Sequence, residues 1–178
     1  MVVSRNSFYF VRHGESEYNA NPHSGVGHDS NLTERGKSQA SCIEPIIAKL
    51  TVQTICVSPL KRAVQTQEII TKNLNCPVVI IDELRECTEA IWFEMNRFER
   101  NPEMQVNEET RQFVKRVLTG INRALEHVGP VLIVAHGGIH FAMCQMMKIF
   151  NYEKDITNCG TVHFAPVHPD AWQAKVLF

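Results

Sequence analysis

The stretch Phe8-Tyr9-Phe10-Val11-Arg12-His13-Gly14-Glu15 carries a short apolar run directly into a polar cluster. The same order of apolar run and polar cluster follows in three later segments. Their apolar runs are Thr54–Val57, Val78–Ile81 and Val131–Ala135. Their polar clusters are Ser58-Pro59-Leu60-Lys61-Arg62, Glu83-Leu84-Arg85-Glu86 and His136-Gly137-Gly138. Short apolar runs that alternate with helical patterns are typical of strands in a mostly parallel sheet, so the sequence predicts an α/β fold.

The polar clusters are expected to meet at one edge of this sheet. Ligands of open α/β sheets bind beyond the carboxyl ends of the strands. His13, Arg62, Glu86 and His136 each lie just past the end of a predicted strand. The order of apolar runs therefore predicts one site built from four distant segments.

Capping residues predict where the helices begin. Thr33 can cap a helix to about residue 50, in which Pro45 should produce a kink or a break. Ser58 as N-cap and Pro59 at the first helical position should open the next helix. Asn107 should cap a long helix.

The remaining segments receive coarser predictions. We expect a long polar loop over 13–32, an irregular lid or short helix over 87–107, and a helix over 138–150. A closing pair of strands is expected over 161–165 and 172–178.

Composition favours one globular domain over residues 1–178, because 44% of the residues are hydrophobic and 21% are charged. The net charge of −1 gives no global attraction to nucleic acid or to an anionic membrane. The amino-terminal segment lacks the features of a signal peptide, and no apolar run is long enough to cross a bilayer. We therefore expect a cytoplasmic protein.

The cysteines favour neither a disulfide scaffold nor a metal site. They are scattered, with no C-x-x-C pair: Cys42, Cys56, Cys76, Cys87, Cys144 and Cys159. His136 and His140 have the four-residue spacing of metal-binding helices, but Gly137 and Gly138 lie between them and the usual Glu is missing. The expected metal content is none.

The residue types at the predicted site fit phosphoryl transfer. Arg12 and Arg62 offer planar cations suited to a tetrahedral anion. A neutral His13 can attack phosphorus to form a phosphohistidine, and the two arginines should lower its pKa. One carboxyl group can protonate the leaving alkoxide and then take a proton from the attacking water. Spacing alone does not choose among five candidates for this acid: Glu15, Glu83, Glu86, Glu89 and Glu94.

Five ordered motifs resemble the histidine phosphatase superfamily, the phosphoglycerate-mutase-like group with an R-H-G signature. They run from about residue 8 to residue 165. The motifs are Arg12-His13-Gly14-Glu15-Ser16 with Asn19, Leu32-Thr33-Glu34-Arg35-Gly36, Ser58-Pro59-Leu60-Lys61-Arg62-Ala63 with Gln65-Thr66, Leu84-Arg85-Glu86, and Ala135-His136-Gly137-Gly138.

This resemblance implies a three-layer α/β/α sandwich on a mixed sheet, with no metal or organic cofactor. It implies that His13 is the phosphorylated nucleophile and that Glu86 is the proton donor. His136, Arg12, Arg62 and Asn19 would complete the phosphate pocket. The implied partner is a small phosphorylated metabolite, with a phosphoprotein as the other possibility.

The chain departs from the family pattern after the acid, where relatives often have glycine and then Trp-Glu-Gly. Here Ala90 replaces the glycine, Trp92 keeps the tryptophan, and Phe93-Glu94 replace Glu-Gly. The chain also lacks the long insertions of family mutases, which favours hydrolysis. The leading hypothesis is a phosphomonoesterase; the alternatives are a phosphoglycerate mutase, a phosphohistidine-protein phosphatase, or a non-catalytic phosphate-binding scaffold.

Overall fold

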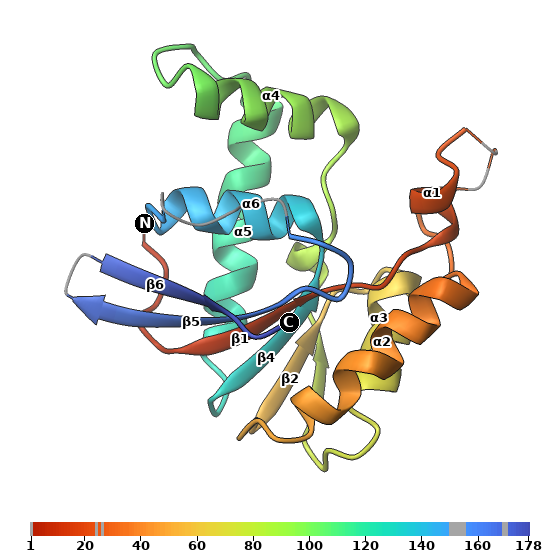
Figure 1. Ribbon diagram of the computed structural model, residues 1–178. Helices are drawn as coiled ribbons and strands as arrows, with labels where there is room; N and C mark the ends of the chain where they lie inside the picture. The colour runs from red at the N-terminus through yellow and green to blue at the C-terminus, as the bar shows by residue number, and fades with distance from the viewer. Residues whose placement is uncertain (1, 24, 26, 150–155, 169–170) are drawn as a thin grey trace.

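A mixed sheet runs through the middle of the computed structural model, which describes residues 2–23, 25, 27–149, 156–168 and 171–178. Over these ranges the sheet has six strands in the order β3-β2-β4-β1-β5-β6 (Figure 1). The strands are β1 Phe8–Arg12, β2 Thr54–Val57, β3 Val78–Ile80, β4 Val131–Ala135, β5 Thr161–His168 and β6 Ala171–Val176.

The first four strands all point the same way. β4 pairs in parallel with both β1 and β2, and β2 pairs in parallel with β3. β5 runs antiparallel to β1, and β6 antiparallel to β5. The predicted mostly parallel sheet is confirmed, and the four polar clusters follow strands that end at the same edge.

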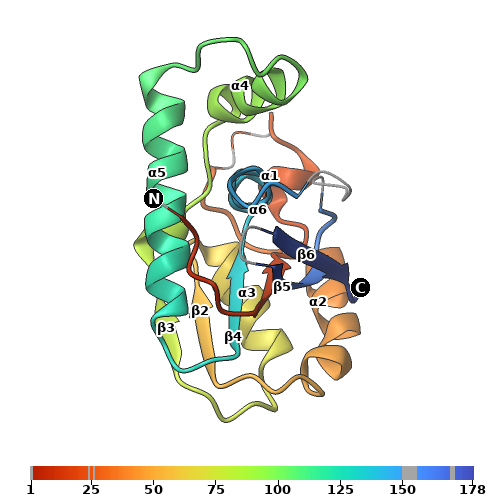
Figure 2. The ribbon, with the colours of Figure 1, turned by 90° about the vertical axis from the view of Figure 1, so that its left-hand side faces the viewer.

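Helices cover both faces of the sheet (Figure 2). β4 shows the division residue by residue. Val131, Ile133 and Ala135 pack in a core that includes residues of α5 and α6, whereas Leu132 and Val134 pack with α2 and α3 on the other face. A strand buried on both sides explains its uninterrupted apolar sequence. The described helices are α1 Glu17–Ala20, α2 Glu34–Ile47, α3 Lys61–Ile70, the 3₁₀ helix η1 Asp82–Leu84, α4 Glu89–Arg100, α5 Glu108–Leu125 and α6 Gly137–Met146.

Two of the predicted helix caps are confirmed. The side chain of Thr33 accepts from the Gly36 N–H at the start of α2, and Asn107 accepts from the Thr110 N–H at the start of α5. The expected break at Pro45 does not occur. Pro45 lies in the last turn of α2, which ends at Ile47, so the hydrogen bond that proline cannot donate is missing only near the end of the helix.

The predicted start of the third helix is wrong. α3 begins at Lys61 with Leu60 as its N-cap, two residues later than Pro59. Ser58 does not cap it. Its hydroxyl forms a short hydrogen bond with His136 Nε2, at 2.7 Å, and a long one with the Leu60 N–H, at 3.4 Å. A long-range contact has displaced the local capping role.

The two segments with the coarsest predictions, 13–32 and 87–107, each contain a helix. The predicted loop over 13–32 contains the short helix α1, whose N-cap Ser16 and residue Asn19 form a capping box. The segment over 87–107 contains the three-turn helix α4, capped by Thr88. None of the helices in the described ranges has the length and apolar character required to span a bilayer.

Candidate active site

Two adjoining cavities lie beyond the carboxyl ends of the parallel strands. They share Arg12, Glu86 and Trp92. The smaller, of about 130 Å³, is also lined by His13, Tyr18, Asn19, His28, Arg62, Cys87, Thr88 and Glu89. The larger, of about 350 Å³, is also lined by Gly137, Gly138, Ile156 and Thr157. Together they form a cleft with a charged end and a roomier end.

The most voluminous cavity described lies elsewhere. It measures about 690 Å³ and is lined by Asn6, Ser7 and Val131, so it lies at the amino ends of β1 and β4. None of the residues that the sequence assigns to the site lines it. Cavity volume therefore does not identify the cavity that holds the predicted site residues, and the charged cleft at the carboxyl edge is the candidate site.

His13 is held in one tautomer. Its Nδ1 lies 2.6 Å from the Gly14 carbonyl oxygen, so Nδ1 must carry the proton that is donated there. Its Nε2 then holds a lone pair, which accepts a hydrogen bond from Arg62 Nε at 3.0 Å. Burial, and next the charge of Arg62, lower the pKa of His13 well below its ordinary value. The ring is therefore neutral, with the lone pair of Nε2 directed toward Arg62.

Arg62 comes from the first turn of α3 and is buried, with 2% of its surface exposed. Besides its bond to His13, its Nη1 donates to the His28 carbonyl oxygen at 2.6 Å. Burial lowers the pKa of Arg62, although an arginine remains charged near neutral pH. A cation so poorly hydrated is well suited to bind an anion.

Arg12, the last residue of β1, lines both cavities. Its Nη1 donates to the Ile156 carbonyl oxygen at 2.6 Å, which fixes the guanidinium at the boundary between them. Its charge also contributes to lowering the pKa of His13. The two arginines therefore act on the same imidazole from separate elements, Arg12 from β1 and Arg62 from α3.

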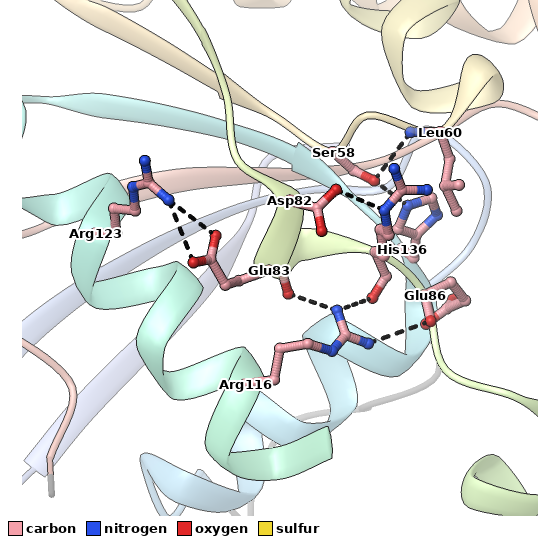
Figure 3. A network of polar contacts seen from close by, with 9 residues as sticks. Ser58, Leu60, Asp82, Glu83, Glu86, Arg116, Arg123 and His136 are labelled. Carbon is pink, nitrogen blue, oxygen red and sulfur yellow. Dashed lines mark hydrogen bonds and ion pairs between the residues drawn. The ribbon is translucent and has the colours of Figure 1, made fainter. Parts of the chain in front are cut away.

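His136 follows β4 and lies beside His13, with ring centroids 5.0 Å apart. Its Nε2 is bonded to the Ser58 hydroxyl, which Figure 3 shows next to the ring. Its Nδ1 is buried and has no hydrogen-bond partner in the part of the chain that the structure describes. Burial, and next the electrostatic interaction with His13, which opposes a second positive charge, hold the pKa of His136 well below its ordinary value.

The carboxylate of Glu86 lies at the N-terminus of α6. Its two oxygens accept from the Cys87 N–H at 3.0 Å and from the Gly138 N–H at 3.1 Å. A Cβ at Gly138 would come within 2.4 Å of Glu86 Oε1 and 2.5 Å of Cys87 Sγ. Glycine is therefore required there for the carboxylate to approach the helix.

Tertiary structure reduces five candidate acids to two. Glu15 pairs with Arg35, and Glu83 pairs with Arg123. Glu94 accepts from the Asn107 N–H and from the Thr110 hydroxyl. The two that line the cleft are Glu86 and Glu89, and Glu89 is bonded to the Tyr18 hydroxyl at 2.9 Å.

Four more lining side chains come from the two segments 13–32 and 87–107, which contain the helices α1 and α4. Asn19, Tyr18, His28 and Trp92 face the smaller cavity. Other residues of these segments do not line either part of the cleft, and they are exposed: His23, Phe93, Arg97 and Arg100. Sequence reasoning missed the role of Ser58 in holding His136, because Ser-Pro is an ordinary helix-start signal.

Cys87 and His140 lie near the site residues, and both side chains are buried. Burial, and next the charge of Glu86, raise the pKa of the Cys87 thiol, so it stays protonated beside the cleft. His140 is buried against the rings of Phe10 and Phe164. The described residues hold no group of three or more His, Cys, Asp or Glu side chains placed to bind a metal ion.

Comparisons with known proteins agree on one family. The model of the histidine phosphatase superfamily (branch 1) matches residues 8–173. The "Uncharacterized phosphatase PhoE" of Bacillus subtilis is 33% identical over 141 residues, which cover 75% of this chain and 72% of that protein. The "Probable phosphoglycerate mutase GpmB" of Photorhabdus laumondii is 35% identical over 112 residues, which cover 63% of this chain and 49% of that protein.

A solved structure agrees at the level of the fold. Bacillus stearothermophilus YhfR superimposes with a TM-score of 0.73 at 21% identity, over 96% of both chains. This chain spans about half the length, or less, of several curated relatives that it matches.

Proposed function

Because this chain belongs to the histidine phosphatase superfamily, we propose that it hydrolyses phosphomonoesters through a phosphohistidine formed on His13. The observation that carries the proposal is the state of that ring. Donation from Nδ1 to Gly14 leaves a lone pair on Nε2, and the lowered pKa keeps the ring unprotonated. A neutral imidazole nitrogen beside a buried arginine is the nucleophile that this chemistry needs.

Four side chains would bind the phosphoryl oxygens. Arg12 and Arg62 supply permanent charge, which stabilises the equatorial oxygens in the transition state. When a phosphate enters, the Nε–H that Arg62 donates to His13 would move to a phosphate oxygen and release the lone pair. A phosphate oxygen would also give a partner to the buried Nδ1 of His136. Asn19 would add a fourth contact.

Glu86 would act first as acid and then as base. As His13 Nε2 bonds to phosphorus and the ester P–O bond breaks, the protonated carboxyl group would give its proton to the departing oxygen. Water would then attack the phosphohistidine, and the carboxylate would take its proton. Inorganic phosphate leaves, and His13 is neutral again. No metal enters this scheme, because two arginines and the α6 N-terminus supply the positive potential.

The proposed substrates are small phosphorylated metabolites. The smaller cavity matches a phosphoryl group, and the 350 Å³ cavity beside Trp92 would receive the leaving group. The likeness to GpmB keeps phosphoglycerate mutase chemistry as a second candidate. Phosphate release by hydrolysis and isomerisation of 3-phosphoglycerate are separate measurable products.

A substrate panel tests this proposal. We expect phosphate release from several phosphorylated metabolites and phosphohistidine proteins to be fastest for a small phosphomonoester and unchanged by chelator. Isomerisation of 3-phosphoglycerate should be slower than hydrolysis of the best ester. Binding of vanadate without turnover of any member of the panel would instead indicate a non-catalytic scaffold.

The pH profile should reflect the lowered pKa of His13. The nucleophile must be unprotonated, so the acidic limb of kcat/KM, which reports the protonation of His13, should lie below pH 6.5. Arg62→Met removes a positive charge that lowers this pKa, so the acidic limb should move to higher pH while the rate falls.

The matched control for this shift is Lys61→Met, which removes the same charge from an exposed position on the neighbouring residue. Its acidic limb should stay where the unmodified protein has it. An acidic limb of the unmodified protein above pH 6.5 would contradict a neutral, buried nucleophile.

A further inference from the structure

Helix α5 presents a row of side chains to the segment that carries Glu86. Arg116, Gly120 and Arg123 are spaced four and three residues apart and therefore share one helix face. Figure 3 shows Arg116 reaching toward Glu83 and Glu86, and Arg123 reaching the carboxylate of Glu83. None of these three residues lines the cleft.

Arg116 binds three carbonyl groups of the main chain that leads to the acid. Its Nη1 donates to the carbonyl oxygens of Glu83 at 2.7 Å and Arg85 at 2.8 Å. Its Nη2 donates to the carbonyl oxygen of Glu86 at 3.4 Å. A segment that has just left a 3₁₀ helix needs partners for its carbonyl groups, and one guanidinium supplies them for three.

The helix is packed closely enough to make this arrangement rigid. At Gly120, one turn after Arg116, an added Cβ would lie 2.9 Å from Glu83 Cβ and 3.2 Å from Leu84 Cδ2. The guanidinium of Arg116 is also 5.0 Å from the centroid of the Phe113 ring, one turn earlier. Backbone contact and guanidinium bonds therefore hold the same segment from the same side.

Resting on the proposed function, we infer that Arg116 is a positioning residue for the acid. The Glu86 carboxylate is held by the N–H of the adjacent residue and by one N–H of α6. Its placement in the cleft therefore depends on where its own main chain lies. Arg116 fixes that main chain without touching substrate. Through it, the position of the proton donor depends on helix α5.

The test is the dependence of rate on the leaving group. Dinitrophenolate departs without protonation, whereas an alkoxide needs the acid. Arg116→Met keeps an unbranched side chain that can pack on Phe113, and it removes the guanidinium with its three hydrogen bonds. We expect kcat/KM for an alkyl phosphate to fall about 100-fold, as for an acid displaced by about 1 Å, while the value for 2,4-dinitrophenyl phosphate changes less than about threefold. Arg116→Lys, which keeps the charge and fewer bonds, should lie between.

Arg123→Met is the matched control. Arg123 lies on the same helix face and binds the same 3₁₀ segment, but it contacts only the side chain of Glu83, at 3.3 Å. The ratio of its two rates should equal that of the unmodified protein. An equal loss on both esters in Arg116→Met, accompanied by a lower melting temperature, would show a purely structural role and overturn the inference.

Glu86→Gln, measured in parallel, separates the two levels of the argument. If it shows the leaving-group dependence and the Arg116 variants do not, the inference about Arg116 fails and the proposed function stands. If Glu86→Gln shows no such dependence while His13 is still phosphorylated, the assignment of the acid fails, and the inference fails with it.

Discussion

His13→Ala should lower kcat/KM for every phosphomonoester by about 10⁴-fold or more, because the covalent route loses its nucleophile. The unmodified protein, incubated with a labelled ester and quenched in alkali, should carry acid-labile phosphate on His13. The variant should carry none. Circular dichroism and thermal unfolding would establish that the variant is folded.

His23→Ala is the control for His13→Ala. His23 lies in the loop after α1, is exposed, and lines neither part of the cleft. Its substitution should leave turnover and labelling as they are. Persistence of label and of full turnover in His13→Ala would require a different nucleophile and would end the proposed mechanism.

Glu86→Gln should produce the second largest effect, and one that depends on the ester. Glutamine keeps an oxygen that can accept from the Cys87 or Gly138 N–H, but its amide has no acidic proton to transfer to the leaving group. For alkyl phosphates we expect kcat/KM to fall by about 10²–10⁴-fold, the usual contribution of general acid catalysis. For 2,4-dinitrophenyl phosphate the loss should be small. The measurement is the slope of log kcat/KM against the pKa of the leaving alcohol.

Glu89→Gln decides between the two carboxylates that line the cleft. Glu89 is already committed to the Tyr18 hydroxyl, so its substitution should leave the slope unchanged. A steeper slope in Glu89→Gln than in Glu86→Gln would transfer the acid to Glu89. The same result would mean that the departure from the family pattern after Glu86 had moved the catalytic carboxylate along the chain.

Predictions from local sequence were confirmed where the structure of a segment depends on its own residues. β4 is apolar at every position and is buried on both faces, as predicted. Asn107 caps α5 through contacts three residues away. For the segment that contains α4, the sequence left an irregular lid or a short helix open, because Trp92, at the cleft, and Phe93, which is exposed, obscure the helical spacing of buried Ile91 and Met95.

The family motifs also identified residues that the fold brings together. His13, Arg12, Arg62 and Glu86 line one cavity, and His136 lies against His13. They converge because parallel strands end at a common edge, a consequence of strand direction that the order of apolar runs already implies. The four-residue spacing of His136 and His140 does not bring the two rings to one site, since His140 is buried between the rings of Phe10 and Phe164.

The amino-acid order by itself determined the α/β class, the strands of the parallel sheet, and which histidines and arginines gather at its edge, because these follow from hydrophobic period and short-range capping. Only the tertiary structure decided which His13 nitrogen carries the proton, which glutamates reach the cleft, and that Arg116 grips the main chain of Glu86. The positions of the glutamates and the bonds of Arg116 depend on contacts between residues distant in the chain. The proton position on His13 depends on how its ring is oriented in the folded protein. No local pattern of residues encodes either.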